Sequence, residues 1–235
     1  MWRGGQDRRL AIIERHVRLD GRRVLDLGCG VGEYVRAFAR RGARALGCDI
    51  EVARLVEARA RGTTNVLAAA GEALPFRTGS LDVVVLNEVI EHVADDAATM
   101  REVGRVLAPG GTCVIFAPNQ LFPFETHGVY VTFRGQRRYI FGNIPLVNWL
   151  PPSLRDRLVP HARVYSRASL DRAVATSGLD VVSRDYVFPG FDNIAGRLGA
   201  PGRLLRTVMH AIEDSPLRAF GISHVYVLRK SAVAR

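Results

Sequence analysis

Short apolar runs alternate with amphipathic segments through the first half of the chain. The apolar runs have the length of buried strands and occupy residues 23–28, 43–50, 64–72, 81–89 and 112–118. Segments whose apolar positions recur at helical spacing lie among them, at residues 33–42, 51–62 and about 95–107. This alternation predicts a parallel, doubly wound α/β sheet, which binds its ligand beyond the carboxyl ends of the strands.

The alternation stops after Pro118. Residues 119–165 hold many of the aromatic residues and five prolines, without a clean strand–helix unit. Order returns with a predicted helix at residues 166–178, capped by Ser166 or Ser169. The remainder predicts a strand at 179–188, a second irregular segment at 189–220 and a last strand at 222–230. We therefore expect one domain over residues 1–235, with 119–165 and 189–220 as insertions that cap the ligand site.

Composition and charge narrow the class of protein only slightly. A hydrophobic content of 48% and a charged content of 24% are ordinary for a globular protein. The net charge of +10 comes almost wholly from arginine, with Lys230 the single lysine. A basic surface is compatible with nucleic acid, anionic lipid or an acidic small substrate, and does not choose among them.

Three cysteines and the start of the chain bear on the cellular compartment. Cys29, Cys48 and Cys113 have no metal-like spacing, and each lies in an apolar run. We expect small buried thiols in a reducing compartment. The first residues lack an apolar stretch of signal-peptide type, and no run reaches the roughly 18 apolar residues of a membrane span. These features favour a soluble, cytoplasmic protein.

The segment "VLDLGCGVGEYVRAF" at residues 24–38 carries the first chemical signal. Gly28, Gly30 and Gly32 follow the first predicted strand, but Glu33 stands where a dinucleotide site has its third glycine. A carboxylate at that helix start would repel a pyrophosphate. No G-x-x-x-x-G-K-[ST] segment occurs, so the turn is expected to hold a ligand without phosphate.

Two acidic residues indicate which ligand that is. Asp26 ends the first strand, where its carboxylate can meet an ammonium group, and the glycines allow the ligand to approach the backbone closely. Asp49 ends the second strand, where an acidic residue can accept both hydrogens of a ribose diol. A ribose and an ammonium group without phosphate describe S-adenosylmethionine (SAM). A plain turn and a plain helix cap are the alternative interpretation of these residues.

The chain resembles the class I SAM-dependent methyltransferases, especially the branch of ubiquinone and menaquinone biosynthesis enzymes. The resemblance is carried by "VLDLGCGVG" (24–32), "GCDI" (47–50), "GEALPF" (71–76), "LDVVVLNEVIEHV" (81–93) and "REVGRVLAPGGTCVIFAPN" (101–119). It implies a Rossmann-like, seven-stranded sheet whose last strand, here 222–230, is antiparallel. It also implies that Glu72 contacts the adenine amino group and that Asn87 lines the methionine end. With their neighbours, the expected cofactor residues are Asp26, Gly28, Cys29, Gly30, Gly32, Asp49, Ile50, Glu72, Ala73 and Asn87, and the product is S-adenosylhomocysteine (SAH).

The acceptor of the methyl group has to be inferred from the insertions. Glu125 and His127 share one face of an extended segment, so Glu125 could orient His127 as the base that deprotonates a hydroxyl. His92 is a reserve candidate for this role, and His161 has a smaller claim. The resemblance of the "PFETHG" segment favours O-methylation of a small polar acceptor, such as a sugar, a glycan or a glycosylated metabolite. The alternative is a structural turn in which both side chains bond to backbone.

Other ligands and partners were weighed on the same residues. No metal is expected, because Glu125 and His127 lack a third ligand. Nucleic acid is disfavoured, because the fourth strand ends in "NEVI" and not in an N-P-P-Y segment. A lipid or quinone acceptor at a membrane stays open, since Leu204, Leu205, Val208, Met209 and Ile212 share one face of residues 203–213. A core-facing helix is the expectation for that segment, and intact cofactor residues disfavour a non-enzymatic binder. The oligomeric state is left open.

Overall fold

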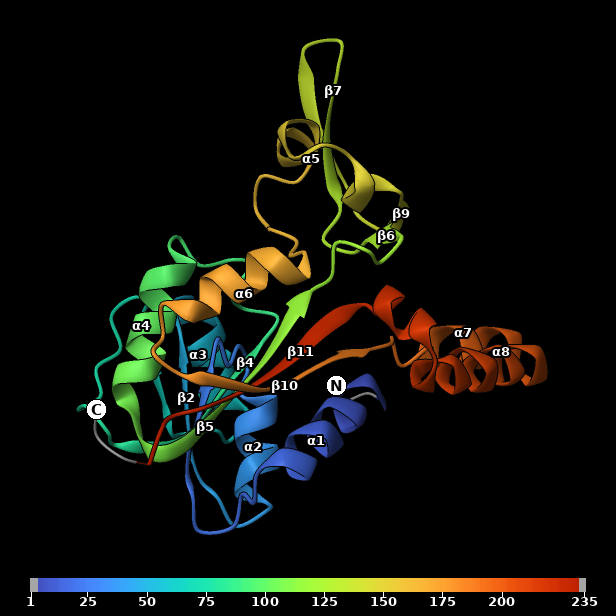
Figure 1. The fold of residues 1–235 in the computed structure, drawn as a ribbon. Coiled ribbons are helices and arrows are strands. Elements are labelled where there is room, and N and C mark those ends of the chain that lie inside the picture. Colours follow the sequence, from blue (N-terminus) through green and yellow to red (C-terminus); the bar gives the residue numbers. More distant parts are fainter. Residues whose placement is uncertain (1–3, 233–235) are drawn as a thin grey trace.

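The computed structural model describes residues 4–232 (Figure 1). Its strands are β1 (Arg23–Leu27), β2 (Arg44–Asp49), β3 (Val66–Ala68), β4 (Leu81–Asn87), β5 (Leu107–Pro118), β6 (Phe124–Glu125), β7 (Val129–Phe133), β8 (Gln136–Ile140), β9 (Ile144–Pro145), β10 (Asp180–Val187) and β11 (Ser223–Arg229). Its α-helices are α1 (Gly4–His16), α2 (Glu33–Ala39), α3 (Val52–Ala60), α4 (Asp96–Val106), α5 (Pro152–Leu158), α6 (Arg167–Ala175), α7 (Asp192–Leu198) and α8 (Ala200–Ala211). Short 3₁₀ turns are η1 (Val147–Trp149), η2 (Ile212–Asp214) and η3 (Pro216–Phe220).

Within residues 4–232, seven strands form one sheet in the order β10-β11-β5-β4-β1-β2-β3. The five strands from β1 to β5 run parallel, whereas β11 pairs antiparallel with both β5 and β10. The order reverses between β1 and β4, and ligands of open α/β sheets bind at such a point. The predicted Rossmann-like fold with an antiparallel last strand is confirmed.

Helices cover both faces of the sheet, because the strands are apolar on both sides. On β1 and β4, Val24 and Val83 face one core while Leu25 and Val84 face the other. The first core contains buried residues of α1, α2 and α3, such as Ile13. The second contains buried residues of α4 and α6. The sheet is thus a rigid support for the loops at its carboxyl edge.

Most of the local predictions agree with the structure, and the differences have physical causes. Ser166 caps α6 by accepting a hydrogen bond from the amide of Ser169, which settles the two predicted alternatives. The fifth strand begins at Leu107 and not at residue 112, because Leu107 pairs with Leu81 and the Gly110 amide bonds to the Lys230 carbonyl. The helix α1 was not predicted. All three cysteines are buried free thiols, as expected.

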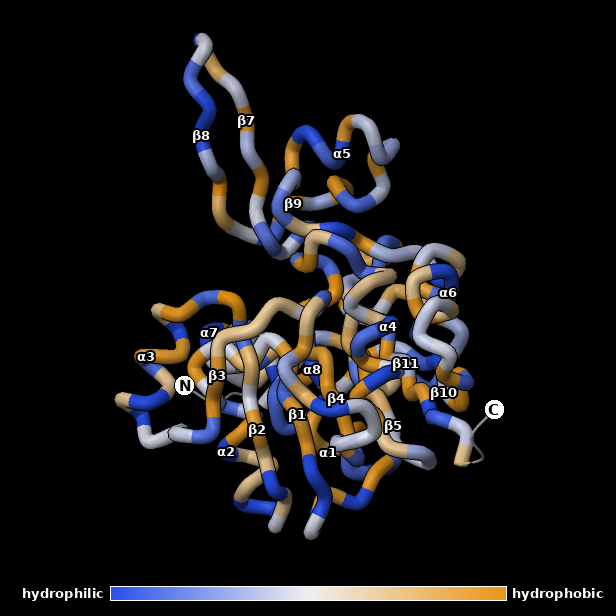
Figure 2. Tube along the Cα trace, turned by 90° about the vertical axis from the view of Figure 1, so that its left-hand side faces the viewer, coloured by the Kyte–Doolittle hydropathy of each residue, from blue (hydrophilic) through white to orange (hydrophobic). Residues whose placement is uncertain are grey.

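The two insertions have regular structure of their own. Residues 119–165 form the small β6–β9 pair, the β7–β8 hairpin and α5, and residues 189–220 form the α7–α8 pair. The hairpin stands clear of the sheet in both views (Figures 1 and 2). Both insertions leave from the carboxyl edge, one after β5 and the other after β10.

Asn119 joins the bases of the two insertions. Its side-chain amide donates to the carbonyls of Ala219 (2.7 Å) and Gly221 (2.8 Å), and its backbone amide donates to Ile222 (3.0 Å). The same residue forms an isolated parallel bridge with Tyr165, where the first insertion returns to the core. Asn119 is buried, so these hydrogen bonds take the place of those that its amide groups would form with water.

Candidate active site

The glycine turn after β1 has a shape that only glycine fits. Gly28 has φ 72°, and a Cβ there would lie 2.4 Å from a methyl of Val89. Gly32 has φ 76°, and a Cβ there would meet Thr63 at 2.7 Å. The amide of Gly28 donates to the Cys48 carbonyl at 2.7 Å, which fixes the turn against β2. The turn thus offers bare backbone beside the loop that follows β4.

Asp26 carries a buried carboxylate that lacks a complete set of partners. Its residue is 2% exposed, and its Oδ2 has no hydrogen-bond partner among the described residues. Burial, followed by the nearby charge of Asp49, raises the pKa of Asp26 to about 8. A buried acceptor of this kind is costly unless a ligand satisfies it.

Asp49 ties the end of β2 to the glycine turn. One carboxylate oxygen accepts the Gly30 amide at 2.7 Å, and the other accepts the Glu51 amide at 2.9 Å. Asp49 thus binds the amide of Glu51, the N-cap residue of α3, but does not itself cap the helix as the alternative interpretation had it. The same carboxylate lies at the carboxyl end of β2, where the sequence places a ribose.

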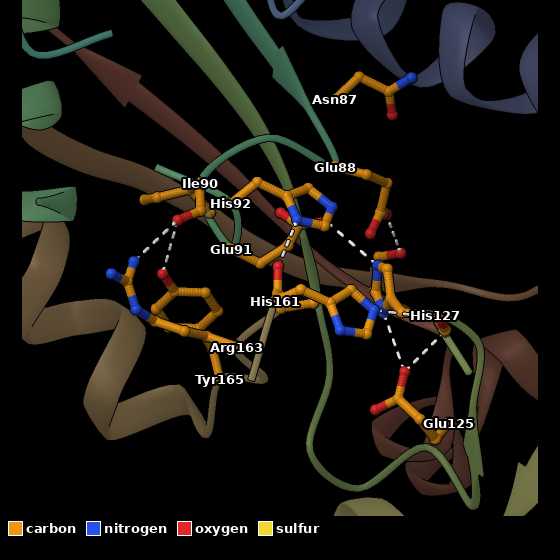
Figure 3. Close-up of polar contacts among 12 residues, drawn as sticks. Asn87, Glu88, Ile90, Glu91, His92, Glu125, His127, His161, Arg163 and Tyr165 are labelled. Carbon is orange, nitrogen blue, oxygen red and sulfur yellow. Dashed lines mark hydrogen bonds and ion pairs between the residues drawn. The ribbon is translucent and has the colours of Figure 1, made fainter. Parts of the chain in front are cut away.

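A cluster of titratable residues follows β4 (Figure 3). The Nε2 atoms of His92 and His127 lie 3.7 and 3.8 Å from Oε1 of Glu91. Glu91 is 2% exposed, and neither carboxylate oxygen has a hydrogen-bond partner among the described residues. One ligand atom from each of these three residues lies within 4.8 Å of the others, an arrangement that could hold a metal ion.

Hydrogen bonds at Nδ1 hold the rings of both His92 and His127. Nδ1 of His92 contacts the His161 carbonyl at 2.9 Å, and Nδ1 of His127 contacts the Glu125 carboxylate at 2.9 Å. Both partners accept, so each Nδ1 carries the proton and each Nε2 is directed toward Glu91. Metal-binding histidines are held in this way by acceptors on their other nitrogen.

Burial and neighbouring charges shift the pKa values of the three residues of the cluster. Burial raises the pKa of Glu91 to about 7, and lowers that of His92. Burial disfavours a charged His127, but its hydrogen bond to Glu125 and its proximity to the Glu91 carboxylate outweigh that effect and raise its pKa to about 9. His127 is thus protonated at neutral pH and cannot accept a proton in this state. His127, the predicted base, therefore needs a neighbouring residue or a bound cation to deprotonate the acceptor.

Glu125 holds His127 from a buried position. Its carboxylate accepts the amide and Nδ1 of His127 and also pairs with Arg155 at 2.8 Å. Arg155 is itself 3% exposed and donates to the Ala162 carbonyl. The predicted orienting role of Glu125 agrees with this geometry, and Arg155 completes it.

Comparisons with known proteins give the family. A methyltransferase-domain family model matches residues 25–115. A ubiquinone biosynthesis O-methyltransferase of Nitrosospira multiformis is 31% identical over 182 residues, which are 74% of this chain and 69% of that protein. One from Methylococcus capsulatus is 27% identical over 96% of this chain and 84% of its own.

Solved structures show the same fold. A SAM-dependent methyltransferase from Mesorhizobium loti has a TM-score of 0.62 at 20% identity, covering 94% of this chain and 96% of its own. A phosphoethanolamine N-methyltransferase of Haemonchus contortus, solved with SAM bound, has a TM-score of 0.62 at 18% identity over 97% of this chain and 53% of its own. This chain is a class I SAM-dependent methyltransferase. Its cofactor is SAM.

The remaining predicted cofactor residues of the methyltransferase have defined contacts. Glu72 accepts the amides of Ala94 and Asp95 at 2.8 and 3.1 Å, so one of its oxygens supports the loop before α4. Asn87 ends β4 and accepts Arg9 Nη1 at 2.6 Å. The adenine contact of Glu72 and the methionine contact of Asn87 stay predictions.

The neighbours of these residues in the methyltransferase differ in exposure. Cys29 is buried beside Gly47, where a Cβ would meet its Sγ at 2.7 Å. Ile50 is 72% exposed and Ala73 is also exposed at the carboxyl edge, so both side chains are free to cover a flat ligand. Their cofactor roles likewise stay predictions.

Several residues of the methyltransferase site were missed from sequence. Glu91 precedes His92 directly, and this acidic–imidazole pair in a strand-end loop was a usable signal. Glu88 has φ 56°, which is rare for a residue with a side chain, and pairs with Arg9 at 2.6 Å. Arg9 lies on the unpredicted α1, so no local pattern could place it here.

A cavity of about 800 Å³ opens beside this site, between α1 and the two insertions. Arg9, which contacts Asn87 and Glu88, lies on its wall. Most of its remaining lining is apolar and includes Phe122, Phe124, Phe188, Phe191, Met209 and Phe220. The methyltransferase thus has a largely apolar cavity whose wall residue Arg9 contacts Asn87 and Glu88 at the end of β4.

Proposed function

We propose that the protein transfers the methyl group of SAM to a hydroxyl oxygen held at Glu91, His92 and His127. The observation that carries this proposal is the convergence of two Nε2 atoms and an unpartnered, buried carboxylate on one point. The loop with these residues touches the glycine turn through Val89 and Gly28. The O-methyltransferase names of the two curated relatives agree with it.

The cofactor residues proposed from sequence fit the methyl donor. Asp26 would pair with the ammonium group of SAM, Asp49 would accept the ribose hydroxyls, and the glycine turn would lie against the methionine chain. In the transfer, the acceptor oxygen forms the new O–CH₃ bond as the C–S bond breaks, leaving SAH. Positioning supplies much of the rate, because the sulfonium methyl is already activated.

The proton of the acceptor hydroxyl needs a separate device. We propose that Glu91, His92 and His127 hold a divalent cation, although no metal was expected from the sequence. A bound divalent cation lowers the pKa of a hydroxyl that coordinates it. Glu125 and the His161 carbonyl keep the Nδ1 protons in place, so each Nε2 would bind the cation, which displaces the second proton of His127.

The shape of the cavity bears on the acceptor. A small sugar would leave the aromatic walls of the cavity uncovered. An amphipathic phenol or quinol would place its apolar body against these walls and its hydroxyl at the cluster. The cavity and the names of the relatives both favour this alternative over the sugar, glycan or glycosylated acceptor expected from sequence.

Two measurements test this function. Purified protein with SAM is offered a catechol bearing a long alkyl chain, the unsubstituted catechol and a methyl glycoside, and products are identified by mass spectrometry. We expect O-methylation of the alkylated catechol above the other two. Methylation confined to nitrogen or carbon acceptors, or to the glycoside, would contradict the proposal.

The cation is tested without relying on turnover. Titration calorimetry with Mg²⁺ and Mn²⁺ should detect a site in the wild type that Glu91→Gln loses and His16→Ala keeps. Chelation with EDTA should abolish methyl transfer, and added metal should restore it. Full activity in EDTA would remove the cation from the proposal and leave the residues themselves as the proton acceptors.

A further inference from the structure

The apolar side chains of helix α8 are oriented differently from what we expected. Leu204, Leu205 and Val208 share one face, and we expected this face to pack on the core. In the structure Leu204 is 66% exposed and Val208 is 51% exposed, and Leu205 is exposed as well. The predicted core-facing orientation is therefore wrong for these three residues, which are turned to solvent, whereas Met209 and Ile212 of the same predicted face are half-buried.

Polar side chains on the other side of α8 hold the helix against the protein. Nε2 of His210 contacts the Pro189 carbonyl at 3.2 Å, and Nδ1 of the same ring contacts Arg8 of α1 at 3.1 Å. Arg206 lies 3.9 Å from the Asp192 carboxylate of α7. These bonds fix the rotation of the helix, so the exposed apolar face is built into the fold.

Further apolar side chains extend this surface. Leu198, at the end of α7, is 58% exposed, and Leu217 of η3 is exposed near the end of the insertion. The α7–α8 pair projects from the body of the molecule, away from the sheet (Figure 1). Exposed apolar side chains on a projecting element are typical of a contact site for a protein or a membrane.

The charges beside this surface favour one of these occupants. Arg197 and Arg203 are exposed on α7 and α8, and the whole chain carries a net charge of +10. A second copy of the chain would bring the same arginines against each other across a symmetric contact. An anionic lipid surface would accept both the leucines and the arginines.

The cavity adds a second reason for a lipid surface. Met209 and Ile212 of the same segment line the cavity, as do Leu217 and Phe220 of η3. One short segment thus carries side chains on both the outer surface and the cavity wall. A hydrophobic acceptor could leave a bilayer at α8 and enter the cavity without crossing water, an argument that rests on the proposed function.

We propose that the exposed face of α8, with Leu198 of α7, is a docking surface for anionic membranes. The apolar side chains enter the boundary between headgroups and acyl chains, and Arg197 and Arg203 contact the headgroups. Every helix within residues 4–232 is too short or too polar to cross a bilayer. The contact is thus peripheral.

Vesicle flotation tests the proposal with neither SAM nor acceptor present. The wild type is mixed with phosphatidylcholine vesicles with or without about 30% phosphatidylglycerol. We expect co-flotation with the anionic vesicles, weakened by salt. Val208→Asp should weaken partitioning about tenfold or more. Val56→Asp is the matched control, because Val56 is a 62% exposed valine on helix α3, and it should float as the wild type does.

The other outcomes overturn the proposal without ambiguity. Calorimetry with SAH first confirms that each variant is folded. Absence of flotation by the wild type, or equal flotation by Val208→Asp, would exclude the docking surface whether or not methyl transfer is confirmed. A dimer in sedimentation that Val208→Asp dissociates, without flotation, would assign the face to a second copy of the chain.

Discussion

The carboxylate of Asp49 accepts the backbone amide of Gly30 across 2.7 Å, so the last residue of β2 holds the glycine turn that follows β1. Its other oxygen accepts the amide of Glu51. One side chain therefore shapes the turn and faces the place proposed for the ribose. Loss of this carboxylate should affect the cofactor in two ways.

We expect Asp49→Ala to weaken SAH binding by about 1–3 kcal/mol, because the ribose loses its acceptor and the Gly30 amide loses its partner. Calorimetric titration measures this directly. Glu51→Ala is the control, since that side chain is exposed and forms an ion pair with Arg54. Wild-type affinity in Asp49→Ala would remove Asp49 from the cofactor site.

Proton release should accompany cofactor binding through Asp26. Its pKa of about 8 in the free protein leaves the carboxyl largely protonated at pH 7. An ammonium group favours the charged form and lowers that pKa, so binding at pH 7 expels a proton. Calorimetry with SAH in buffers of different ionisation enthalpy should show this release, and Asp26→Asn should abolish it. Buffer-independent heats in the wild type would contradict the contact.

The same residue predicts how stability depends on pH. The folded pKa of Asp26 lies above the value of about 3.9 for an unfolded chain, so the native state holds the proton more tightly. Its contribution is therefore most favourable at low pH and is lost as pH rises through about 8. Relative to the wild type, Asp26→Asn should gain stability between pH 5 and 9, as followed by thermal unfolding. A constant difference over that range would disprove the assignment.

His127→Ala should separate catalysis from cofactor binding. We expect turnover to fall by about 10²- to 10⁴-fold, because the acceptor hydroxyl loses its means of deprotonation. SAH affinity should be unchanged, since His127 comes from the first insertion and not from the glycine turn. His16→Ala, at the end of α1, provides the control. Lost SAH affinity with normal turnover would place His127 at the cofactor instead.

Arg155 should be essential to the stability of the first insertion. Arg155→Met removes one of the two cations beside the buried Glu125 and leaves His127 as the other, so the cost should approach the roughly 3–5 kcal/mol of comparable buried pairs. Urea unfolding measures the loss, and the exposed Arg157→Met is the matched control. The double variant Glu125→Gln with Arg155→Met should recover much of the stability. Equal stability of the two single arginine variants would show that the pair contributes little.

The sheet and the glycine turn could be predicted because their signals are local. Each strand is an apolar run, and the turn needs glycine where φ is positive, as at Gly28 and Gly32. The helix α1 gave a weak signal, because Leu10 and Ile13 are its only buried residues among those described, and charged residues surround them.

The cluster of Glu91, His92 and His127 could not be assembled from sequence, because its contacts are tertiary. Glu91 and His127 are 36 positions apart, and Arg155 reaches Glu125 from a third segment. Without these contacts, Glu125 and His127 were two candidate residues with no third partner. The orientation of α8 shows a related limit: periodicity gave the apolar face correctly but not what covers it.

The clamp at Asn119 has a consequence for how acceptor specificity changes among relatives. Because one buried side chain bonds the bases of both insertions, replacing the first alone would remove the Asn119 amide, and replacing the second alone would remove the segment that holds its Ala219 acceptor. Recombination that exchanges a single insertion should give a poorly folding chimera. Exchange of both together should preserve the hydrogen bonds of Asn119. The two insertions are therefore expected to be inherited as a pair, and new acceptors to arise by substitution within them.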